Sequence, residues 1–257
     1  MYDNFSADYD RFVNWDERLA FEMPFIENVV KQVRSRKNPP LDILDTACGT
    51  GMHAVALAKQ GHKVSAADLF PEMIYKSHHN AHEANVELQL VKAGLGDMAR
   101  TFGRERFDLV MCLGNSLPHL LTFAELADSL RDFAACLRPG GMVLIQNRNF
   151  DAVMSKKQRW MDPQPHREGD AEWLFQRFYD FEPDGLIRFN IVTLKRFGVS
   201  SWQASVTDTR LRPQLRAELE QTTLRAGFNE LQLFGSMKGE PFSPAASGNL
   251  ILTAYKE

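Results

Sequence analysis

The chain lacks the marks of a secreted or membrane-spanning protein. Its 257 residues include only three cysteines, and no two of them form a CxxC pattern. An odd number of cysteines without such a framework is typical of buried thiols in a reducing compartment. The start, MYDNFSADYDRF, is acidic and aromatic and so does not resemble a signal or transit peptide, and no apolar run approaches the length that spans a bilayer. We therefore expect a cytoplasmic protein with no membrane partner.

An excess of basic residues is also missing. The chain has 30 Lys and Arg against 33 Asp and Glu, which gives a formal charge of −3. This balance supplies no general attraction for a phosphate backbone and argues against a nucleic-acid partner. Hydrophobic residues make up 44% and charged residues 25%, as in an ordinary soluble enzyme with one large α/β domain. The oligomeric state does not follow from the composition.

What the sequence does contain is an alternation of apolar strands and helices between residues 39 and 150. Apolar runs at 41–45, 63–68 and 107–114 are separated by helical patterns, and a helix at 123–137 leads to another apolar run. Such alternation predicts a parallel sheet with right-handed crossovers and with helices on both faces.

The pattern changes after Asn149. Residues 151–170 are polar and read as a loop or irregular helix, and three later segments alternate like antiparallel strands, with EPDG as a turn. Pro213 opens a last helix, which two strands follow. We predict one domain over 1–257 in four parts: an N-terminal helical lid (1–38), a core (39–150), an antiparallel cap (151–211), and a closing helix with a strand pair (212–257).

The stretch DTACGTG at 45–51 joins the first expected strand to a helix. Gly49 and Gly51 permit a sharp turn and let a ligand approach the main chain, where helix-end N–H groups face it. Asp68 ends the next strand, and its carboxylate can accept hydrogen bonds from both hydroxyls of a ribose. A tight turn followed by an unrelated acid would look the same, because short glycine motifs are weak signals.

A dinucleotide-binding turn is the main alternative, since residues 49–54 satisfy G-x-G-x-x-A and Asp68 lies near the expected distance. Asp45 argues against it, because its carboxylate would repel a pyrophosphate but would suit a ligand with an ammonium and a sulfonium. The helical lead-in and the lack of a separate substrate domain argue the same way. No Gly-Lys-Ser/Thr follows the turn, which excludes a P-loop.

Several segments, taken in order, are similar to the motifs of class I S-adenosylmethionine-dependent methyltransferases. They are LDILDTACGTG (41–51), Asp68-Leu69, GLGDM (94–98), FDLVMCLGNSLPHL (107–120), LRPGGMVLIQNRNFD (137–151) and the closing GFNELQLFGSM and GNLILTAYKE. The resemblance implies an α/β, Rossmann-like methyltransferase fold: a seven-stranded, mostly parallel sheet with a reversed last strand, plus the antiparallel β cap. It also implies S-adenosylmethionine as cofactor. GNSLPHL and NRNFD resemble the glycine and glycine/sarcosine N-methyltransferase group.

The same resemblance implies a set of cofactor-binding residues. Asp45 and the glycine turn would hold the methionyl part, Asp68 the ribose, and Asp97 the edge of the adenine. The residues assigned to the cofactor in this way are Tyr9, Trp15, Arg18, Asp45, Ala47, Gly49, Gly51, Asp68, Leu69, Met73, Asp97, Met98 and Leu113.

The N-terminal members of this set have two interpretations. In the glycine-methylating group an arginine on an N-terminal segment grips the cofactor carboxylate, and Arg18 would do so here. Arg18 also precedes Glu22 by four residues, which is the spacing of an ion pair on a helix surface. Tyr9 would either cover the sulfonium through cation–π attraction or pack against the first helix.

Candidate catalytic residues follow the fourth and fifth core strands. Asn115 and His119 would overhang the transferred methyl group, with His119 orienting the acceptor or acting as a base. Arg148 would pair with a carboxylate of the acceptor or form a salt bridge with Asp151. Tyr9 completes the catalytic set, and no metal site is expected, because His78 and its neighbours have no further ligands in the sequence.

We therefore predict an enzyme that transfers a methyl group from S-adenosylmethionine to a small-molecule acceptor, with an amine or amino acid as the first candidate. Two alternatives stay open at this point: an NAD(P)-dependent oxidoreductase, and a methyltransferase that acts on nucleic acid or protein.

Overall fold

The computed structural model describes residues 8–35 and 38–257. A seven-stranded sheet lies at its centre, and its strands are β1 (Asp42–Thr46), β2 (Lys63–Asp68), β3 (Gln89–Lys92), β4 (Phe107–Cys112), β5 (Leu137–Arg148), β10 (Phe228–Phe234) and β11 (Asn249–Lys256). The strand order is β10-β11-β5-β4-β1-β2-β3. β1 to β5 are parallel, whereas β11 runs antiparallel to both β5 and β10. The predicted mostly parallel sheet with a reversed last strand is confirmed.

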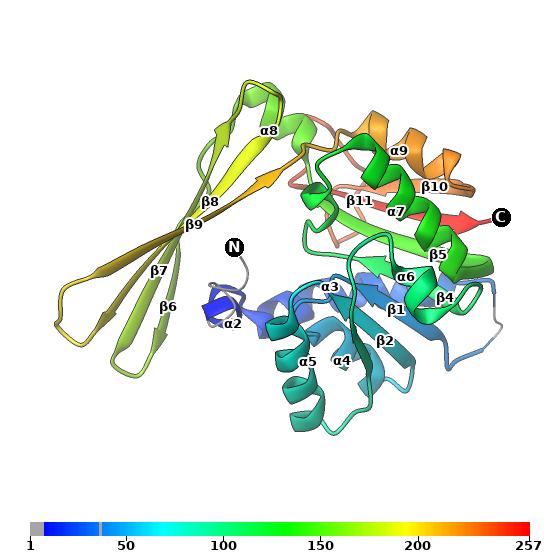
Figure 1. The fold of residues 1–257 in the computed structure, drawn as a ribbon, viewed down its shortest axis with the longest axis horizontal. Helices are drawn as coiled ribbons and strands as arrows, with labels where there is room; N and C mark the ends of the chain where they lie inside the picture. The colour runs from blue at the N-terminus through cyan, green and yellow to red at the C-terminus, as the bar shows by residue number, and fades with distance from the viewer. Residues whose placement is uncertain (1–7, 36–37) are drawn as a thin grey trace.

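Helices cover both faces of this sheet (Figure 1). They are α2 (Tyr9–Phe12), α3 (Trp15–Gln32), α4 (Met52–Lys59), α5 (Pro71–Glu83), α6 (Met98–Phe102), η2 (Leu117–His119), α7 (Phe123–Cys136), α8 (Phe150–Lys156) and α9 (Arg216–Arg225). Every residue of β4 is buried. Its side chains alternate between the faces, so that Val110 packs with α7 and α9 while Leu109 packs with α3 and α4. This two-sided burial explains the continuous apolar runs of the central strands.

A second sheet forms the cap, which projects from the core at the left of Figure 1. Its strands are β6 (Gln164–Glu168), β7 (Ala171–Phe181), β8 (Ile187–Phe197) and β9 (Gln203–Leu211), antiparallel in the order β6-β7-β8-β9. The turn at 182–185 lies where EPDG predicts it. β6 is a strand in a stretch that the sequence predicts as a loop or irregular helix, because an edge strand with mostly exposed polar residues lacks the apolar alternation of a half-buried strand.

The cap is attached to the core by two small apolar clusters. Phe150 and Val153 of α8 pack with Tyr179 of β7, while Phe12 of α2 meets the ring of Phe175 edge-on at 5.5 Å. One face of β7 therefore points toward the core and the N-terminal segment. The four-part division of the chain into a lid, core, cap and closing segment stays a prediction.

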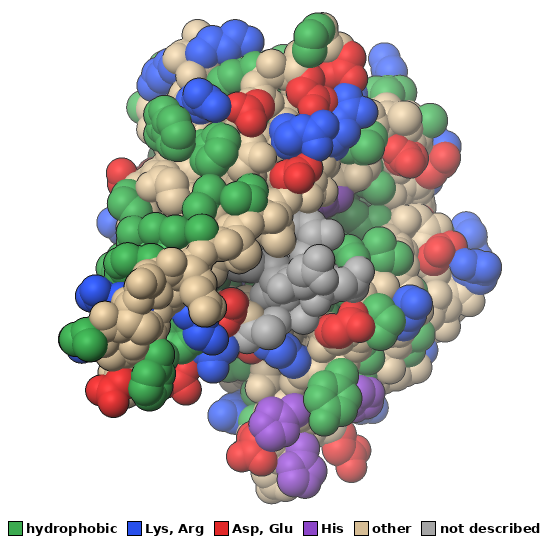
Figure 2. All heavy atoms as spheres, turned by 60° about the vertical axis from the view of Figure 1, so that its left-hand side comes forward, with side chains coloured by type: hydrophobic (Ala, Val, Ile, Leu, Met, Phe, Trp, Pro, Cys, Tyr) green, Lys and Arg blue, Asp and Glu red, His purple; other side chains and the backbone are tan. Residues whose placement is uncertain are grey.

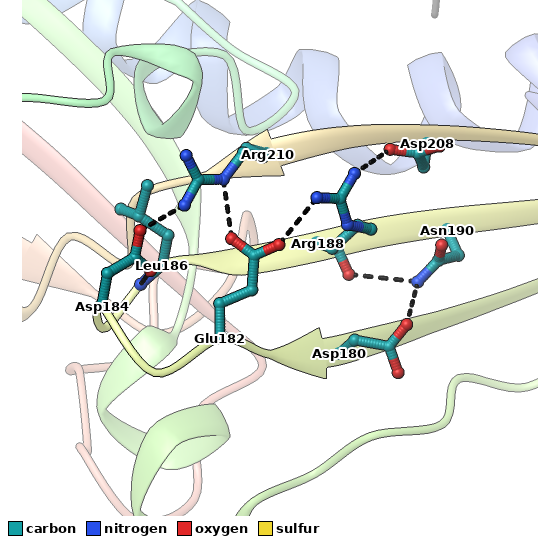
Figure 3. Close-up of polar contacts among 8 residues, drawn as sticks. All are labelled: Asp180, Glu182, Asp184, Leu186, Arg188, Asn190, Asp208 and Arg210. Atoms are coloured by element: carbon teal, nitrogen blue, oxygen red, sulfur yellow. Dashed lines mark hydrogen bonds and ion pairs between the residues drawn. The ribbon is translucent and has the colours of Figure 1, made fainter.

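Ion pairs fasten the turn end of the cap (Figure 3). Glu182 accepts from Arg188 Nη2 at 2.9 Å and from Arg210 Nε at 2.6 Å. Arg188 also pairs with Asp208 at 2.6 Å, and Asp184 pairs with Arg210. Partly exposed pairs of this kind add little stability individually, but the network links the turn after β7 to both β8 and β9.

None of the helices in the described ranges combines the length and apolar content needed to cross a bilayer. On the molecular face drawn in Figure 2, basic and acidic side chains are interspersed. The histidine side chains at one end of that view belong to α5, where His78, His79 and His82 are exposed. Across the described part of the chain, no group of three His, Cys, Asp or Glu residues is arranged to hold a metal ion.

Candidate active site

A cavity of about 470 Å³ opens beyond the carboxyl ends of β1, β2 and β4. Open α/β sheets bind ligands at this edge. The cavity is lined by Tyr9, Trp15, Arg18, Asp45, Ala47, Cys48, Gly49, His53, Asp68, Leu69, Phe70, Met73, Ala93, Gly94, Leu95, Leu113, Gly114, Ser116, His119 and Leu120. Ten of the thirteen residues predicted to bind the cofactor therefore line one cavity, and His119 of the predicted catalytic set lines it as well.

The turn after β1 has an unusual backbone. Ala47, Gly49 and Gly51 all have positive φ, of 54°, 58° and 78°. At Gly51 a Cβ atom would lie only 2.7 Å from the hydroxyl oxygen of Ser77 on α5, so glycine is required there by packing as well as by conformation. The N–H of Cys48 donates to the carbonyl of Ala67 at 2.8 Å, which fixes the turn against β2.

Asp45 is the most informative residue of the cavity. Its side chain lines the cavity and is 2% exposed, and in the described residues its Oδ2 atom is buried without a hydrogen-bond partner. Burial, and after it the charge of Asp68, raises the pKa of Asp45 to about 7. A buried carboxylate is costly unless a donor or cation joins it. The cavity therefore suits a ligand with a positive group at this point and disfavours a pyrophosphate.

Asp68 is fixed by two main-chain donors. Its Oδ2 accepts from the N–H of Gly49 at 2.9 Å, and its Oδ1 accepts from the N–H of Phe70 at 3.0 Å. Each carboxylate oxygen keeps a further lone pair for ligand hydroxyls. The next residue, Leu69, is 56% exposed although it is apolar, and it lines the same cavity. An acid that can bind a diol beside an uncovered apolar side chain fits a nucleoside.

The first two helices supply the wall opposite the glycine turn. Asp10 ties this segment to the rest of the site, because its Oδ1 accepts from Trp15 Nε1 at 2.9 Å and from Thr50 Oγ1 at 2.8 Å. Arg18 lies over the ring of Trp15 at 5.0 Å and reaches the cavity. Burial raises the pKa of the Tyr9 phenol, and Arg18 opposes this rise. Tyr9 is therefore protonated at neutral pH.

The ion pair that the spacing of Arg18 and Glu22 predicts is present, but it is not on the surface. Arg18 Nε donates to Glu22 Oε2 at 3.1 Å, and Glu22 is only 5% exposed. Because Arg18 also lines the cavity, the two interpretations of this arginine are compatible.

Three predicted cofactor residues are not in the cavity lining. Gly51 shapes the turn after β1 through its positive φ and does not itself line the cavity. The carboxylate of Asp97 pairs with Arg100 at 2.7 Å. The Met98 side chain is fully buried in the core, and its N–H already donates to Asp132 Oδ2 at 2.6 Å. In place of the pair at 97–98, the lining contains Ala93, Gly94 and Leu95.

Two predicted catalytic residues lie beside the cavity and not in its lining. Asn115 Oδ1 accepts from the N–H of Arg148 at 2.9 Å, so this side chain joins the loop after β4 to the end of β5. Within residues 8–35 and 38–257, the salt bridge considered between Arg148 and Asp151 does not form, and Asp151 Oδ2 instead accepts from the N–H of Arg216 at 2.9 Å. His119 does line the cavity, and burial lowers its pKa to about 4, so its imidazole is neutral at pH 7.

The inner face of the cap adds an arginine that the sequence analysis did not single out. Arg177 of β7 lies over the ring of Phe12 at 4.9 Å. Among the described residues its buried Nε atom has no hydrogen-bond partner. Burial, and after it the positive charge of Arg148, lowers the pKa of Arg177. Nothing in the local sequence separates Arg177 from the surface arginines of the cap, because its position depends on how the cap folds back on the core.

Comparisons with known proteins agree with this geometry. Residues 43–141 match a family model described as a methyltransferase domain. The chain is 30% identical over 154 residues to the glycine/sarcosine N-methyltransferase of Aphanothece halophytica, a match that covers 60% of this chain and 56% of that protein. The chain spans about half the length of the curated relatives that it matches.

Solved structures with the same fold cover nearly the whole chain. An S-adenosylmethionine-dependent methyltransferase from Clostridium acetobutylicum superimposes with a TM-score of 0.77 at 17% identity, over 99% of this chain and 98% of that one. The sugar N-methyltransferase KedS8 from Streptoalloteichus superimposes with a TM-score of 0.76 at 20% identity, over 100% and 93% of the two chains.

The glycine turn, the acid after β2, the reversed last strand and these matches together support a class I S-adenosylmethionine-dependent methyltransferase. S-Adenosylmethionine, not a dinucleotide, is its cofactor. The cavity fits this cofactor, because the buried Oδ2 atom of Asp45 has no hydrogen-bond partner among the described residues and because Asp68 and Leu69 suit a nucleoside.

Proposed function

We propose that this protein methylates the amine nitrogen of a small molecule that also carries an anionic group, as an amino acid does. The observation that carries the proposal is the pair of arginines under the cap. Arg148 and Arg177 lie close enough for the charge of one to lower the pKa of the other. In the described ranges neither guanidinium has a carboxylate within 4.0 Å, and Arg177 Nε is buried without an acceptor. Two such cations favour an anionic ligand.

The position of Arg148 relates this pair to the methyl donor. Arg148 is bound through its N–H to Asn115, whose neighbours Gly114 and Ser116 both line the cavity. An acceptor anchored by its anion at the end of β5 would therefore present its other end toward the cofactor. The relatives named as glycine/sarcosine and sugar N-methyltransferases support nitrogen as the acceptor atom.

Bound S-adenosylmethionine supplies an activated methyl group on a sulfonium, so the tasks left to the protein are holding, orienting and excluding water. We propose that Asp45, Arg18 and the turn from Ala47 to Gly51 hold the methionyl end, and that Asp68 and Leu69 hold the nucleoside. Tyr9, which lines the cavity next to Gly49, would shield this region from solvent. His119, with its lowered pKa of about 4, is a weak base, so the acceptor amine must arrive without its proton or lose it to solvent.

Paired acceptors test the proposal. We would measure the formation of S-adenosylhomocysteine with glycine and sarcosine, and with methylamine and dimethylamine as partners that lack the carboxylate. We expect the wild-type protein to methylate the two amino acids. The Arg148→Met variant should lose this turnover but keep its affinity for S-adenosylhomocysteine. Equal rates with both members of each pair would refute the anionic acceptor, and methylation of phenols or thiols alone would refute nitrogen as the acceptor.

A further inference from the structure

A buried carboxylate lies behind the cavity, outside the set of residues that face the ligand. Glu22 of α3 is 5% exposed and does not line the cavity. Its Oε2 atom accepts from His53 Nε2 at 2.7 Å and from Arg18 Nε at 3.1 Å. Its Oε1 atom accepts from Gln146 Nε2 at 3.1 Å. One side chain of α3 thus joins its own helix to α4 and β5.

All three partners connect Glu22 to the cavity wall. Arg18 lines the cavity, and its Nη2 atom would lie 3.5 Å from a Cβ placed on Gly114. Gln146 connects Glu22 to the loop after β4, because its Oε1 atom accepts from the N–H of Gly114 at 3.1 Å. Glu22 therefore contacts, directly or through one residue, both Arg18 and the neighbouring 113–114 loop, at the end of the cavity where the methionyl group is proposed to bind.

The third partner, His53, also lines the cavity and holds the carboxylate from α4. His53 is 4% exposed, and its ring meets Trp15 edge-on at 5.5 Å. Burial lowers the pKa of His53, so its imidazole is neutral and acts as an N–H donor to Glu22. Trp15 in turn carries Arg18 over its ring. The guanidinium is thus held at Nε by Glu22 and on one face by an aromatic ring, and Arg18 lines the cavity next to Tyr9.

Glu22 is ionised although burying a carboxylate costs desolvation free energy, and filling this space would not require a charged side chain. Burial disfavours the carboxylate, but the hydrogen bond from His53 and the charge of Arg18 outweigh it and lower the pKa of Glu22 to about 2. An apolar side chain of similar size would fill the same space without this desolvation cost. We therefore attribute the charge of Glu22 to the side chains that it orients, Arg18 and Gln146.

We infer that Glu22 is a positioning residue for the methyl donor: held by His53, its carboxylate aims Arg18 at the cofactor carboxylate and, through Gln146, fixes the N–H group of Gly114. The inference rests on the proposed role of Arg18. Because Glu22 touches only the methionyl end of the site, it acts on one half of the ligand and not on the nucleoside half.

Two ligands that share the nucleoside test this division. S-Adenosylhomocysteine contains the amino acid part, whereas 5′-methylthioadenosine lacks it. We expect Glu22→Gln to weaken binding of S-adenosylhomocysteine about tenfold by calorimetry, the size of a lost charge-assisted contact, and to change binding of 5′-methylthioadenosine less than about twofold. KM for S-adenosylmethionine should rise while kcat at saturation changes little, because the chemistry itself is untouched.

A cycle with Arg18→Met separates this inference from the role of Arg18. If Glu22 acts through Arg18, the double variant Glu22→Gln, Arg18→Met binds S-adenosylhomocysteine about as weakly as Arg18→Met alone. Additive losses, or an equal loss for both ligands in Glu22→Gln, would overturn the inference. An Arg18→Met variant with unchanged affinity would instead refute the proposed role of Arg18.

A second variant guards against misfolding of Glu22→Gln. His53→Gln keeps an N–H donor near the carboxylate, and thermal unfolding establishes that both variants are folded. We expect the His53→Gln variant to lose less affinity for S-adenosylhomocysteine than Glu22→Gln. A larger loss in His53→Gln would place the function in the histidine and overturn the assignment to Glu22.

Discussion

The cavity wall around Asp45 and the inner face of the cap around Arg177 are the two walls to compare: each has a buried polar atom without a hydrogen-bond partner, and the two side chains have opposite charge. On the cofactor side, Asp45 is buried with a carboxylate oxygen that lacks a donor. On the cap side, Arg177 is held over an aromatic ring with a guanidinium nitrogen that lacks an acceptor. Both statements concern the described residues. Because unpaired buried charge is costly, this difference in sign is the basis for the proposed positions of the cationic cofactor on one side and the anionic acceptor on the other.

The walls also differ in how they are built. The cofactor side uses main-chain geometry, with left-handed residues in the turn and N–H groups that fix Asp68. The cap side uses long side chains on the inner face of β7. A backbone cradle can recognise one ligand common to a whole family, whereas side chains on a sheet can change without altering the fold. The comparison therefore predicts that variants of the two walls affect different ligands.

The largest effect is expected from Asp45→Asn. Removing the charge that faces the positive end of the cofactor should weaken S-adenosylmethionine binding about a hundredfold, the upper range for a hydrogen bond to a charged group. Calorimetry would measure it. The matched control is Asp128→Asn on the outer surface of α7, where the carboxylate is largely exposed. If Asp45→Asn and the control bound S-adenosylmethionine with equal affinity, Asp45 could not be the residue that binds the positive end of the cofactor.

Arg177→Met tests the opposite wall. We expect KM for an anionic acceptor to rise about tenfold, because one of two guanidiniums is lost, while the affinity for the cofactor stays within about twofold. Arg188→Met serves as the control, since Arg188 belongs to the ion-pair network of Figure 3. Arg177 pairs in register with Ile191, so Arg188, three residues away on β8, lies on the other face of the cap sheet. If Arg177→Met instead weakened cofactor binding and left the KM for the acceptor unchanged, the assignment of ligands to the two walls would be reversed.

Asp68→Ala should weaken cofactor binding tenfold or more, roughly 1.4 kcal/mol. The same carboxylate fixes the N–H groups of Gly49 and Phe70, so the melting temperature of the free protein should fall as well. Asp68→Asn keeps an acceptor oxygen, so its cofactor affinity and its melting temperature should both fall less than those of Asp68→Ala. Calorimetry that gives wild-type affinity for Asp68→Ala would contradict the ribose assignment.

The smallest effect is a pH dependence. The pKa of Asp45 is raised to about 7 in the free protein, and a cationic ligand favours the ionised form. Cofactor affinity should therefore rise several-fold between pH 6 and pH 7.5, with protons released on binding, and Asp45→Asn should abolish the rise. The folded free protein holds this proton more tightly than the unfolded chain, so the contribution to stability is present at low pH and is lost as the pH rises through about 7.

The sequence was sufficient to predict the core, and ten of the thirteen residues that it assigns to the cofactor line the cavity. The continuous apolar runs and the glycine turn determined the parallel strands, and the acids at strand ends were placed correctly because strand ends of a parallel sheet meet at one edge. Asp97 and Met98 were harder to place, because the loop after β3 has no periodicity that sets its register. From the sequence, Glu22 is expected to lie on the surface of its helix. Its burial could not be predicted, because it depends on the packing of α3 against α4 and β5.

Helix α2 has a practical consequence for protein engineering. Tyr9 lies against Gly49 of the turn, Phe12 lies against Phe175 and Arg177 of the cap, and Arg11 pairs with Glu168 of β6. A chimera that received the cap of another methyltransferase but kept its own first helix would carry two mismatched surfaces. Grafting acceptor specificity between such enzymes should therefore exchange residues 8–13 together with the cap, although the two segments are far apart in the chain.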